Sequence, residues 1–248
     1  NGHTRHLQRL DIAVDRALAD LEARKPGAAA AARQLLETSG VTGEVRRLLA
    51  IRIPELMLYQ NMAYARRYVE FVKTVAAAEQ RLVPDQTRFS EAVARYLFKL
   101  MAYKDEYEVA RLLLQERFLQ RLRTEFGVDA QIAFNLHPPL LRALGLKRKL
   151  RLGTWFIPVL NILRGLRPLR GTPLDPFGYA KVRRVERELI GEYRRRIEFL
   201  LPRLNEDNYG VAVQIAELPD PVPGPEDVTV RVRASAVNRA DLLQRRGF

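Results

Sequence analysis

The stretch from Phe89 to Leu114 is the feature that most constrains how this chain can fold. Its large side chains and one alanine recur alternately four and three residues apart, which places them along one face of an α-helix. They are Tyr96, Leu100, Tyr103, Tyr107, Ala110 and Leu114. One helix cannot bury such a face alone. We therefore predict a helix here that organises the fold and packs against partners from both sides of it in sequence.

Helical periodicity continues through most of the first 218 residues. We predict helices over residues 4–21, 28–36, 45–82 and 180–201, and a short last helix that ends at about Glu217. Pro54 marks a start or a kink within 45–82. Residues 131–136 alternate polar and apolar side chains, as a short strand does. The predicted fold class is mainly α: a multi-helix, bundle-like domain with one or two short strands.

Two local features refine these helices. Thr87 or Ser90 is placed to cap the helix that begins near Phe89. The helix over 180–201 has a predicted apolar face of its own, made of Val182, Val185, Leu189, Tyr193, Ile197 and Leu200.

The charge balance is strongly basic. Against 29 Asp and Glu the chain has 42 Lys and Arg, a net charge of +13. This suits an acidic partner, which could be nucleic acid, an anionic surface or an acidic protein. The most basic stretch, Arg142 to Arg170, contains prolines that preclude one continuous recognition helix, and no nucleic-acid signature appears. We therefore interpret its apolar residues, Trp155 among them, as core anchors, and its arginines as facing a partner protein or a carboxylate-rich surface.

The chain contains no cysteine. This excludes disulfides, thiolate nucleophiles and cysteine-ligated clusters within these residues, and it fits a reducing compartment. No leader peptide and no unbroken apolar run of membrane length is present. We expect a cytoplasmic protein without a membrane span. The absence of an initiator Met before Asn1 suggests a piece of a longer chain.

Catalytic and metal motifs are not found. The sequence has no glycine-rich phosphate loop, no HExxH and no GxSxG. His3 and His6 have a spacing that could hold a metal, but no third ligand lies nearby. His137 precedes two prolines and is interpreted as a loop residue. We predict no catalytic, cofactor-binding or metal-binding residue in this chain.

Three carboxylates cluster in the middle of the chain at Asp105, Glu106 and Glu108. Lys104 and Arg111 neighbour them, and Glu108 can pair with both on a solvated helix face. Because ion networks also perturb titration, we interpret this cluster as structural rather than as an acid–base pair.

The pattern changes at Pro219. Residues 219–225 are rich in proline and read as a linker, and Val228–Arg233 then alternates as a β-strand. A lone strand is an incomplete structural unit. We predict a helical domain over residues 1–218 and a truncated, β-containing tail over 219–248.

Three strings resemble one family: Tyr59–Tyr68, Glu91–Leu112 and Arg170–Tyr179. They are similar to the C-terminal domain of indolepyruvate ferredoxin oxidoreductases, over roughly residues 45–218. That family oxidatively decarboxylates arylpyruvates to acyl-CoA and passes the electrons to ferredoxin. The resemblance implies that thiamine diphosphate and iron–sulfur clusters lie in other domains and that this chain binds neither. It further implies an accessory domain that packs on the catalytic domains of the same enzyme and reaches ferredoxin only through the full enzyme.

The tail resembles something else. Residues 217–247 are similar to the opening of a zinc-independent quinone oxidoreductase of the medium-chain dehydrogenase type, most distinctly over Val237–Gly247. In those enzymes the residue matching Asn238 lies near the nicotinamide and the substrate. The printed sequence has no nucleotide-binding half, so we assign Asn238 no working role. A gene fusion, a frameshift or an assembly join would each explain the change.

Three hypotheses remain after the sequence alone. The first is a non-catalytic accessory domain of an indolepyruvate ferredoxin oxidoreductase-like enzyme. The second is a basic helical binding module for nucleic acid or an anionic surface, which predicts affinity that falls steeply with salt. The third is a fragment of an NADPH quinone oxidoreductase.

Overall fold

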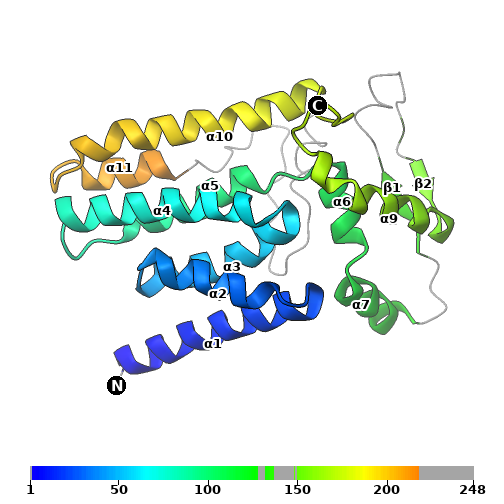
Figure 1. The fold of residues 1–248 in the computed structure, drawn as a ribbon, viewed down its shortest axis with the longest axis horizontal. Coiled ribbons are helices and arrows are strands. Elements are labelled where there is room, and N and C mark those ends of the chain that lie inside the picture. Colours follow the sequence, from blue (N-terminus) through cyan, green and yellow to red (C-terminus); the bar gives the residue numbers. More distant parts are fainter. Residues whose placement is uncertain (1, 128–131, 137–147, 149, 218–248) are drawn as a thin grey trace, which may run out of the picture. The chain divides into compact units, whose positions relative to one another are not determined.

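The computed structural model describes residues 2–127, 132–136, 148 and 150–217, without the side chains of residues 2–11, 13 and 117 (Figure 1). This part of the chain is mainly helical, with ten α-helices and one two-stranded antiparallel sheet. The predicted fold class is thereby confirmed. The predicted linker and tail, residues 219–248, lie outside the described residues, so the boundary at Pro219 stays a prediction.

The first seven helices run in sequence order up to residue 126. They are α1 (Gly2–Arg24), α2 (Ala28–Ser39), α3 (Gly43–Tyr59), α4 (Met62–Leu82), α5 (Arg88–Met101), α6 (Glu106–Leu113) and α7 (Glu116–Phe126). The remaining elements are β1 (Phe134–Leu136), β2 (Leu150–Leu152), α9 (Ile157–Gly165), α10 (Lys181–Leu200) and α11 (Tyr209–Ala216), with short 3₁₀ turns η1 (Thr154–Phe156), η2 (Arg167–Leu169) and η3 (Leu201–Arg203).

Helix α5 lies at the centre of the helical packing. It contacts α3 and α4, which precede it, and α10 and α11, which follow it (Figure 1). Phe89, Val93 and Leu97 of α5 are each 0% exposed. The prediction that this stretch organises the fold, with partners from both sides of the sequence, is confirmed for its first half.

The prediction of a single helix from Phe89 onward is wrong in its second half, because residues 102–105 interrupt the helix between α5 and α6. Helix α5 ends at Met101, and α6 begins after Asp105. The Asp105 carboxylate accepts a hydrogen bond from the backbone N–H of Glu108 at 2.8 Å and so caps α6. The predicted apolar face is also misplaced within α5, since Leu97 and Met101 are buried whereas Leu100 is only half-buried.

The region 45–82 likewise forms two helices instead of one, and the break is not at Pro54. Pro54 lies inside α3 and is buried. Helix α3 ends at Tyr59, and Asn61 caps α4 by accepting a hydrogen bond from the backbone N–H of Tyr64 at 2.9 Å. The Asn61 side chain supplies an acceptor for an N–H group that the first turn leaves unpaired.

A second, smaller core lies between α6, α9 and the hairpin of β1 and β2. Phe134 pairs with Leu152 across the hairpin, and its side chain packs with Ala110 of α6 and Leu160 of α9. The strand predicted over 131–136 is therefore present at its described end. Leu160 is an apolar core residue of the basic stretch, as expected. Trp155 is not, because its side chain is 69% exposed.

Helix α10 agrees with its predicted bounds, but its predicted apolar face is correct only toward the C-terminus. Tyr193 and Ile197 are buried, whereas Val182, Val185 and Leu189 are exposed. In the N-terminal half the inward side chains are charged, and Arg183 is the most buried of them. This half of α10 faces a cluster of acidic residues, described below.

The core assignment of α5 predicts a clear contrast between two leucines. Leu97→Ala should lower the free energy of unfolding by about 3–5 kcal/mol, because a fully buried leucine leaves a cavity among packed helices. Leu100→Ala, at a half-buried position, should cost about 1–2 kcal/mol. Urea denaturation followed by circular dichroism measures both. Equal costs at the two positions would contradict the observed orientation of α5.

Candidate functional site

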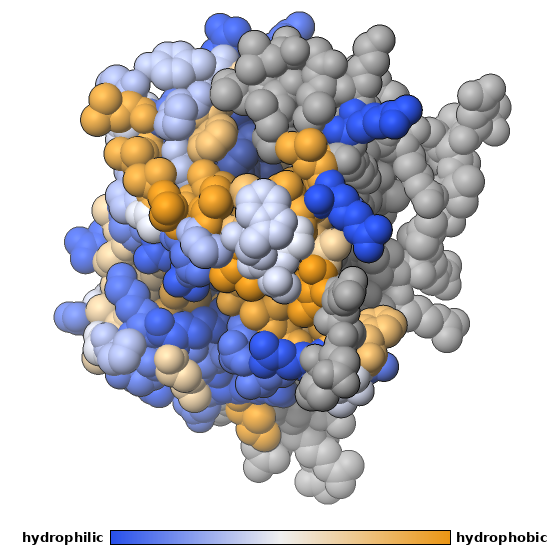
Figure 2. Space-filling view, turned by 90° about the vertical axis from the view of Figure 1, so that its right-hand side faces the viewer, coloured by the Kyte–Doolittle hydropathy of each residue, from blue (hydrophilic) through white to orange (hydrophobic). Residues whose placement is uncertain are grey.

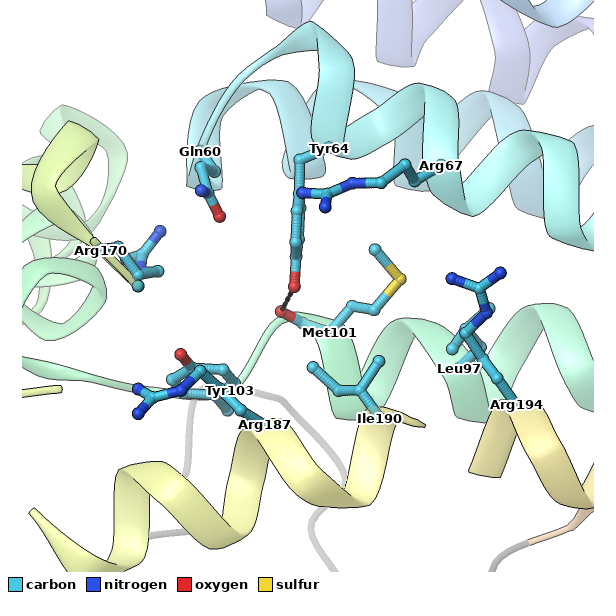
Figure 3. A pocket seen from close by; sticks show the side chains of 11 residues that line it. Gln60, Tyr64, Arg67, Leu97, Met101, Tyr103, Arg170, Arg187, Ile190 and Arg194 are labelled. Carbon is cyan, nitrogen blue, oxygen red and sulfur yellow. Dashed lines mark hydrogen bonds between the residues drawn. The ribbon is translucent and has the colours of Figure 1, made fainter. Parts of the chain in front are cut away.

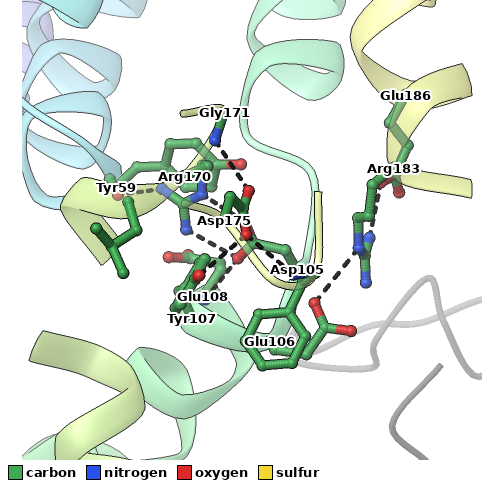
Figure 4. Close-up of polar contacts among 12 residues, drawn as sticks. Tyr59, Asp105, Glu106, Tyr107, Glu108, Arg170, Gly171, Asp175, Arg183 and Glu186 are labelled. Carbon is green, nitrogen blue, oxygen red and sulfur yellow. Dashed lines mark hydrogen bonds and ion pairs between the residues drawn. The ribbon is translucent and has the colours of Figure 1, made fainter. Parts of the chain in front are cut away.

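Arg170 and Asp105 form the centre of a buried polar cluster (Figure 4). They are 4% and 3% exposed. The Arg170 guanidinium donates to both carboxylate oxygens of Asp105, with Nη2 2.8 Å from Oδ1, and its Nη1 donates to the backbone carbonyl of Tyr59. The guanidinium carbon lies 3.6 Å from the centroid of the Tyr59 ring. Each charge is thus taken out of water with a matched, bidentate partner, as buried ion pairs require.

Asp175 supports the same cluster from the turn that follows Arg170. Its Oδ1 accepts a hydrogen bond from the hydroxyl of Tyr107 at 3.0 Å, and its Oδ2 accepts one from the backbone N–H of Gly171 at 2.9 Å. Burial and this hydrogen bond raise the pKa of Tyr107, so its hydroxyl remains a donor. A Cβ atom at Gly178 would lie 2.8 Å from Asp175 Oδ2. The turn therefore has room for glycine alone at this position without a shift of the carboxylate.

Glu108 and Arg111 form a second ion pair, which α3 completes. Arg111 Nη2 lies 2.7 Å from Glu108 Oε1 and 2.9 Å from Glu55 Oε2. The pairing of Glu108 with Arg111 is therefore confirmed. The solvated face predicted for it is wrong, because both side chains are buried. Glu55 of α3, which the sequence pattern does not connect to α6, supplies the second carboxylate.

Arg183 of α10 lies between two carboxylates, Glu106 and Glu186. Its Nη1 donates to Glu186 Oε2 at 2.7 Å, and its Nε lies 3.5 Å from Glu106 Oε2 without a hydrogen bond (Figure 4). Asp105, Glu106 and Glu108 thus face three different arginines. The predicted ion network is present, but Arg170 and Arg183 are distant in sequence and were not among its expected members.

Arg183 and its carboxylates predict a specific pH dependence of stability. Burial raises the pKa of Glu106 and of Glu186 above 4.5, and Arg183 opposes this rise. A raised pKa in the folded state gives a stabilising contribution that is present below pH 4.5 and lost as pH increases through the raised pKa. Glutamine does not titrate, so in Glu106→Gln the part of this pH-dependent loss of stability that comes from Glu106 is absent. The stability of the variant relative to the parent should therefore increase from pH 4.5 toward 7.

Urea denaturation at several pH values between 4.5 and 7 measures this difference. Glu22→Gln is the control, because hydrogen bonds from the backbone N–H groups of Gly27 and Ala29 lower the pKa of Glu22. Its contribution is complete above pH 4.5 and is lost only as pH decreases through the lowered pKa. The control difference should be flat from 4.5 to 7. A flat or falling difference for Glu106→Gln would contradict the prediction.

A pocket of about 290 Å³ lies beside this cluster, between α4, α5 and α10 (Figure 3). Four arginines line it: Arg67, Arg170, Arg187 and Arg194. Figure 3 shows them on several sides of the pocket, with Arg67 on α4 and both Arg187 and Arg194 on α10. Among the described residues, no carboxylate side chain lines it. Sequence reasoning missed this site, because its arginines come from segments more than one hundred residues apart.

The remaining lining is apolar and aromatic. Leu97, Met101 and Ile190 form the apolar part, and Tyr64 and Tyr103 supply two phenol rings. The Tyr64 hydroxyl donates to the backbone carbonyl of Met101 at 2.9 Å, which fixes its ring against the pocket (Figure 3). Burial raises the pKa of Tyr103, while the neighbouring Arg187 opposes the rise. Both phenols remain neutral near pH 7 and add no negative charge to the site.

Several candidate residues named from the sequence lie outside the part of the chain whose side chains the structure describes. The side chains of His3 and His6 are outside the described part, although both residues lie in α1. His137 and Asn238 lie outside the described residues altogether. Among the side chains that the structure describes, no group of three or more His, Asp or Glu is arranged to hold a metal ion.

Comparison with known proteins gives a family. A family profile described as "Family of unknown function (DUF6537)" matches residues 45–241, well over half of the chain. The chain belongs to the DUF6537 family. The matched region contains the ionic cluster and the arginine-lined pocket, and it continues beyond Pro219. No curated protein and no solved structure matches the chain. In the described part of this DUF6537 protein, no helix is both long and apolar enough to cross a membrane.

Proposed function

We propose that this chain is a non-catalytic, helical accessory domain of an indolepyruvate ferredoxin oxidoreductase-like enzyme. The observation that carries the proposal is spatial. The three strings that resemble that family, residues 59–68, 91–112 and 170–179, come together in the buried ionic cluster. Arg170 of the third string contacts the carbonyl of Tyr59 in the first and the carboxylate of Asp105 in the second.

These contacts make the three segments depend on one another structurally. A buried charge is tolerated only with its partners in place, since removing one partner leaves the other uncompensated. Arg170 therefore depends on Asp105, and Asp175 depends on the Tyr107 hydroxyl and on the turn at Gly171. A chain that keeps one string under this constraint is expected to keep the others. The resemblance then rests on residues that lie in one interdependent arrangement, which supports a common domain.

Exposed apolar side chains on the surface could pack against other domains. Val182, Val185 and Leu189 leave an apolar strip exposed on α10, and Ile162 of α9 is also exposed. Figure 2 shows apolar side chains gathered among charged ones on the face of the molecule that it presents. Exposed apolar areas of this kind are typical of protein contacts. In this proposal the catalytic domains cover such areas.

The chemistry belongs to those other domains. Thiamine diphosphate there supports decarboxylation of the arylpyruvate, and iron–sulfur clusters there pass electrons to ferredoxin in the cytoplasm. The buried carboxylates of Asp105 and Glu108 are each paired with an arginine, and those of Glu79 and Asp175 accept hydrogen bonds from neutral donors. Their part in the proposal is to hold the accessory domain in shape.

The test is native isolation from source cells with an antibody raised against residues 45–217. We expect an assembly that contains thiamine diphosphate and iron, and that reduces an artificial electron acceptor when an arylpyruvate and coenzyme A are added. A parallel isolation with non-immune antibody controls for carry-over. An isolated protein with neither cofactor and no such activity would refute the proposal.

A further inference from the structure

We infer that the arginine-lined pocket is a binding site for a small organic anion, with an oxyanion group held by arginines and an apolar body held by the opposite wall. The oxyanion is a carboxylate or a phosphate, since the guanidinium fork fits both. This inference concerns the pocket alone and does not depend on the accessory role proposed above.

The first argument is charge. Arg170 is already balanced by Asp105, so it adds little net charge to the pocket. Within the described part of the chain, Arg67 has no ion pair and contacts the Tyr64 ring, 5.2 Å from its centroid. The nearest carboxylate oxygen to Arg194, from Glu198, is 3.9 Å away, too far for a hydrogen bond.

Arg187 provides the second argument. Its Nη2 donates to the backbone carbonyl of Gly178 at 2.6 Å, which fixes the guanidinium in place. Its Nη1 is buried and makes no hydrogen bond of good geometry to a described residue, although the guanidinium also lies beside the Tyr103 phenol and opposes the rise that burial causes in the pKa of that group. An unpaired buried donor is unfavourable, and a charged one more so. Arg187 also lines the pocket, so an oxyanion there would lie beside this incompletely paired charge.

The apolar wall provides the third argument and limits the ligand. Leu97 and Met101 are buried, and together with Ile190 they form a surface that a bare inorganic ion would leave uncovered. A volume of about 290 Å³ lies at the small end of ligand sites, about the size needed by a single ring with one charged substituent. The favoured ligand therefore combines an oxyanion with a compact apolar group.

Calorimetric titration of the full chain with four compounds tests the class of ligand. These probes are benzoate, phenyl phosphate, inorganic phosphate and benzamide, each in 150 mM salt to suppress general attraction to the basic surface. We expect saturable one-to-one binding of benzoate, of phenyl phosphate, or of both. Binding of benzoate alone assigns a carboxylate site, and binding of phenyl phosphate alone assigns a phosphate site.

Benzamide has the same ring without the charge and should bind at least tenfold more weakly. Binding of benzamide as tight as benzoate would overturn the role of the arginines. Inorganic phosphate as tight as phenyl phosphate would overturn the role of the apolar wall. Absence of saturable binding by both organic anions would overturn the site.

Three variants locate the binding. Arg187→Met should weaken binding of the preferred anion about 10- to 100-fold, because a positive charge that lines the pocket is lost. Arg67→Met, at an exposed position that is tolerant of change, should weaken it about three- to tenfold. Arg196→Met is the matched control on the outward face of α10, where Arg196 pairs with Glu192, and should leave affinity unchanged.

Circular dichroism and thermal melting establish that each variant is folded before titration. If Arg187→Met fails to fold, the affinity of Arg67→Met still tests the site, because Arg67 is exposed and its replacement should not affect folding. Wild-type affinity in both folded pocket variants, or an equal loss in Arg196→Met, would overturn the assignment.

Discussion

Asp105→Ala should lower the free energy of unfolding by about 3–5 kcal/mol. The substitution leaves the Arg170 guanidinium buried without its counter-ion, which is the costly way to break a buried ion pair. It also removes the side-chain acceptor that caps α6 at the backbone N–H of Glu108. Urea denaturation followed by circular dichroism at 222 nm measures the change.

The control and a double variant separate these contributions. Asp207→Ala, at an exposed position outside the cluster, should change stability by no more than about 0.5 kcal/mol. In Asp105→Ala/Arg170→Met the uncompensated charge is gone, so the double variant should be less destabilised than the two single changes added together. Additive losses would mean that the two side chains do not interact, and a near-neutral Asp105→Ala would mean that the cluster is solvated.

The sequence predicted most helices of this fold because helix periodicity is a local property. The bounds of α10 agree with the predicted helix over 180–201, and α5 begins where expected. The break between α5 and α6 was missed for the opposite reason. Asp105 ends the helical run because it caps α6 and pairs with Arg170, sixty-five positions away. Periodicity cannot report a partner at that distance.

The same limit explains the apolar face of α10. Val182 and Leu189 follow the helical period, so the pattern assigned them to the core. In the structure Val182 and Leu189 are exposed. The ion pair of Arg183 with Glu106 of α6 determines which face of α10 points inward in the N-terminal half of the helix. An apolar pattern identifies the buried side only where apolar contacts determine the packing. Here buried charges determine it.

The arginine-lined pocket could not be found from the sequence for a related reason. Arg67 and Arg187 stand in ordinary amphipathic helices, where arginines are typical of solvated faces. Only the packing of α4 and α5 against α10 gathers them around one cavity. The ionic cluster did leave a sequence signal, since Asp105, Glu106 and Glu108 are adjacent. The pairing of Glu108 with Arg111 was predicted, whereas Arg170, Arg183 and Glu55 became known only from the fold.

Glu79→Ala should destabilise the protein by at least about 3 kcal/mol, although nothing in the local sequence marks Glu79 as important. Its carboxylate is 1% exposed and accepts hydrogen bonds from the backbone N–H groups of Phe89 and Ser90, both at 2.9 Å, and from the hydroxyl of Tyr209 at 2.6 Å. Removing it leaves the Ser90 N–H and the Tyr209 hydroxyl without this acceptor, while the Phe89 N–H keeps only a longer bond to the Tyr209 oxygen at 3.2 Å. An unsatisfied buried donor costs roughly 1–3 kcal/mol. Denaturation in urea again measures the loss.

The comparison with Thr87→Ala makes the prediction specific. Sequence reasoning placed Thr87 or Ser90 as the cap of α5, and Thr87 does occupy the N-cap position, but its side chain makes no capping hydrogen bond. Glu79 of α4 fills that role, with a negative charge at the positive end of the α5 dipole. Thr87→Ala should therefore cost less than about 1 kcal/mol, below the typical cost of losing a capping side chain.

Tyr209→Phe and Glu70→Ala complete the series. Burial, with the hydrogen bond to Glu79, raises the pKa of Tyr209 to about 12, so its hydroxyl is a donor near neutral pH. Its loss should cost about 1–2 kcal/mol, less than loss of the shared acceptor. Glu70→Ala, on the exposed side of α4, should be near neutral. A larger loss in Thr87→Ala than in Glu79→Ala would show that α5 is capped locally. The reverse order would establish that α4, α5 and α11 are joined through one buried carboxylate.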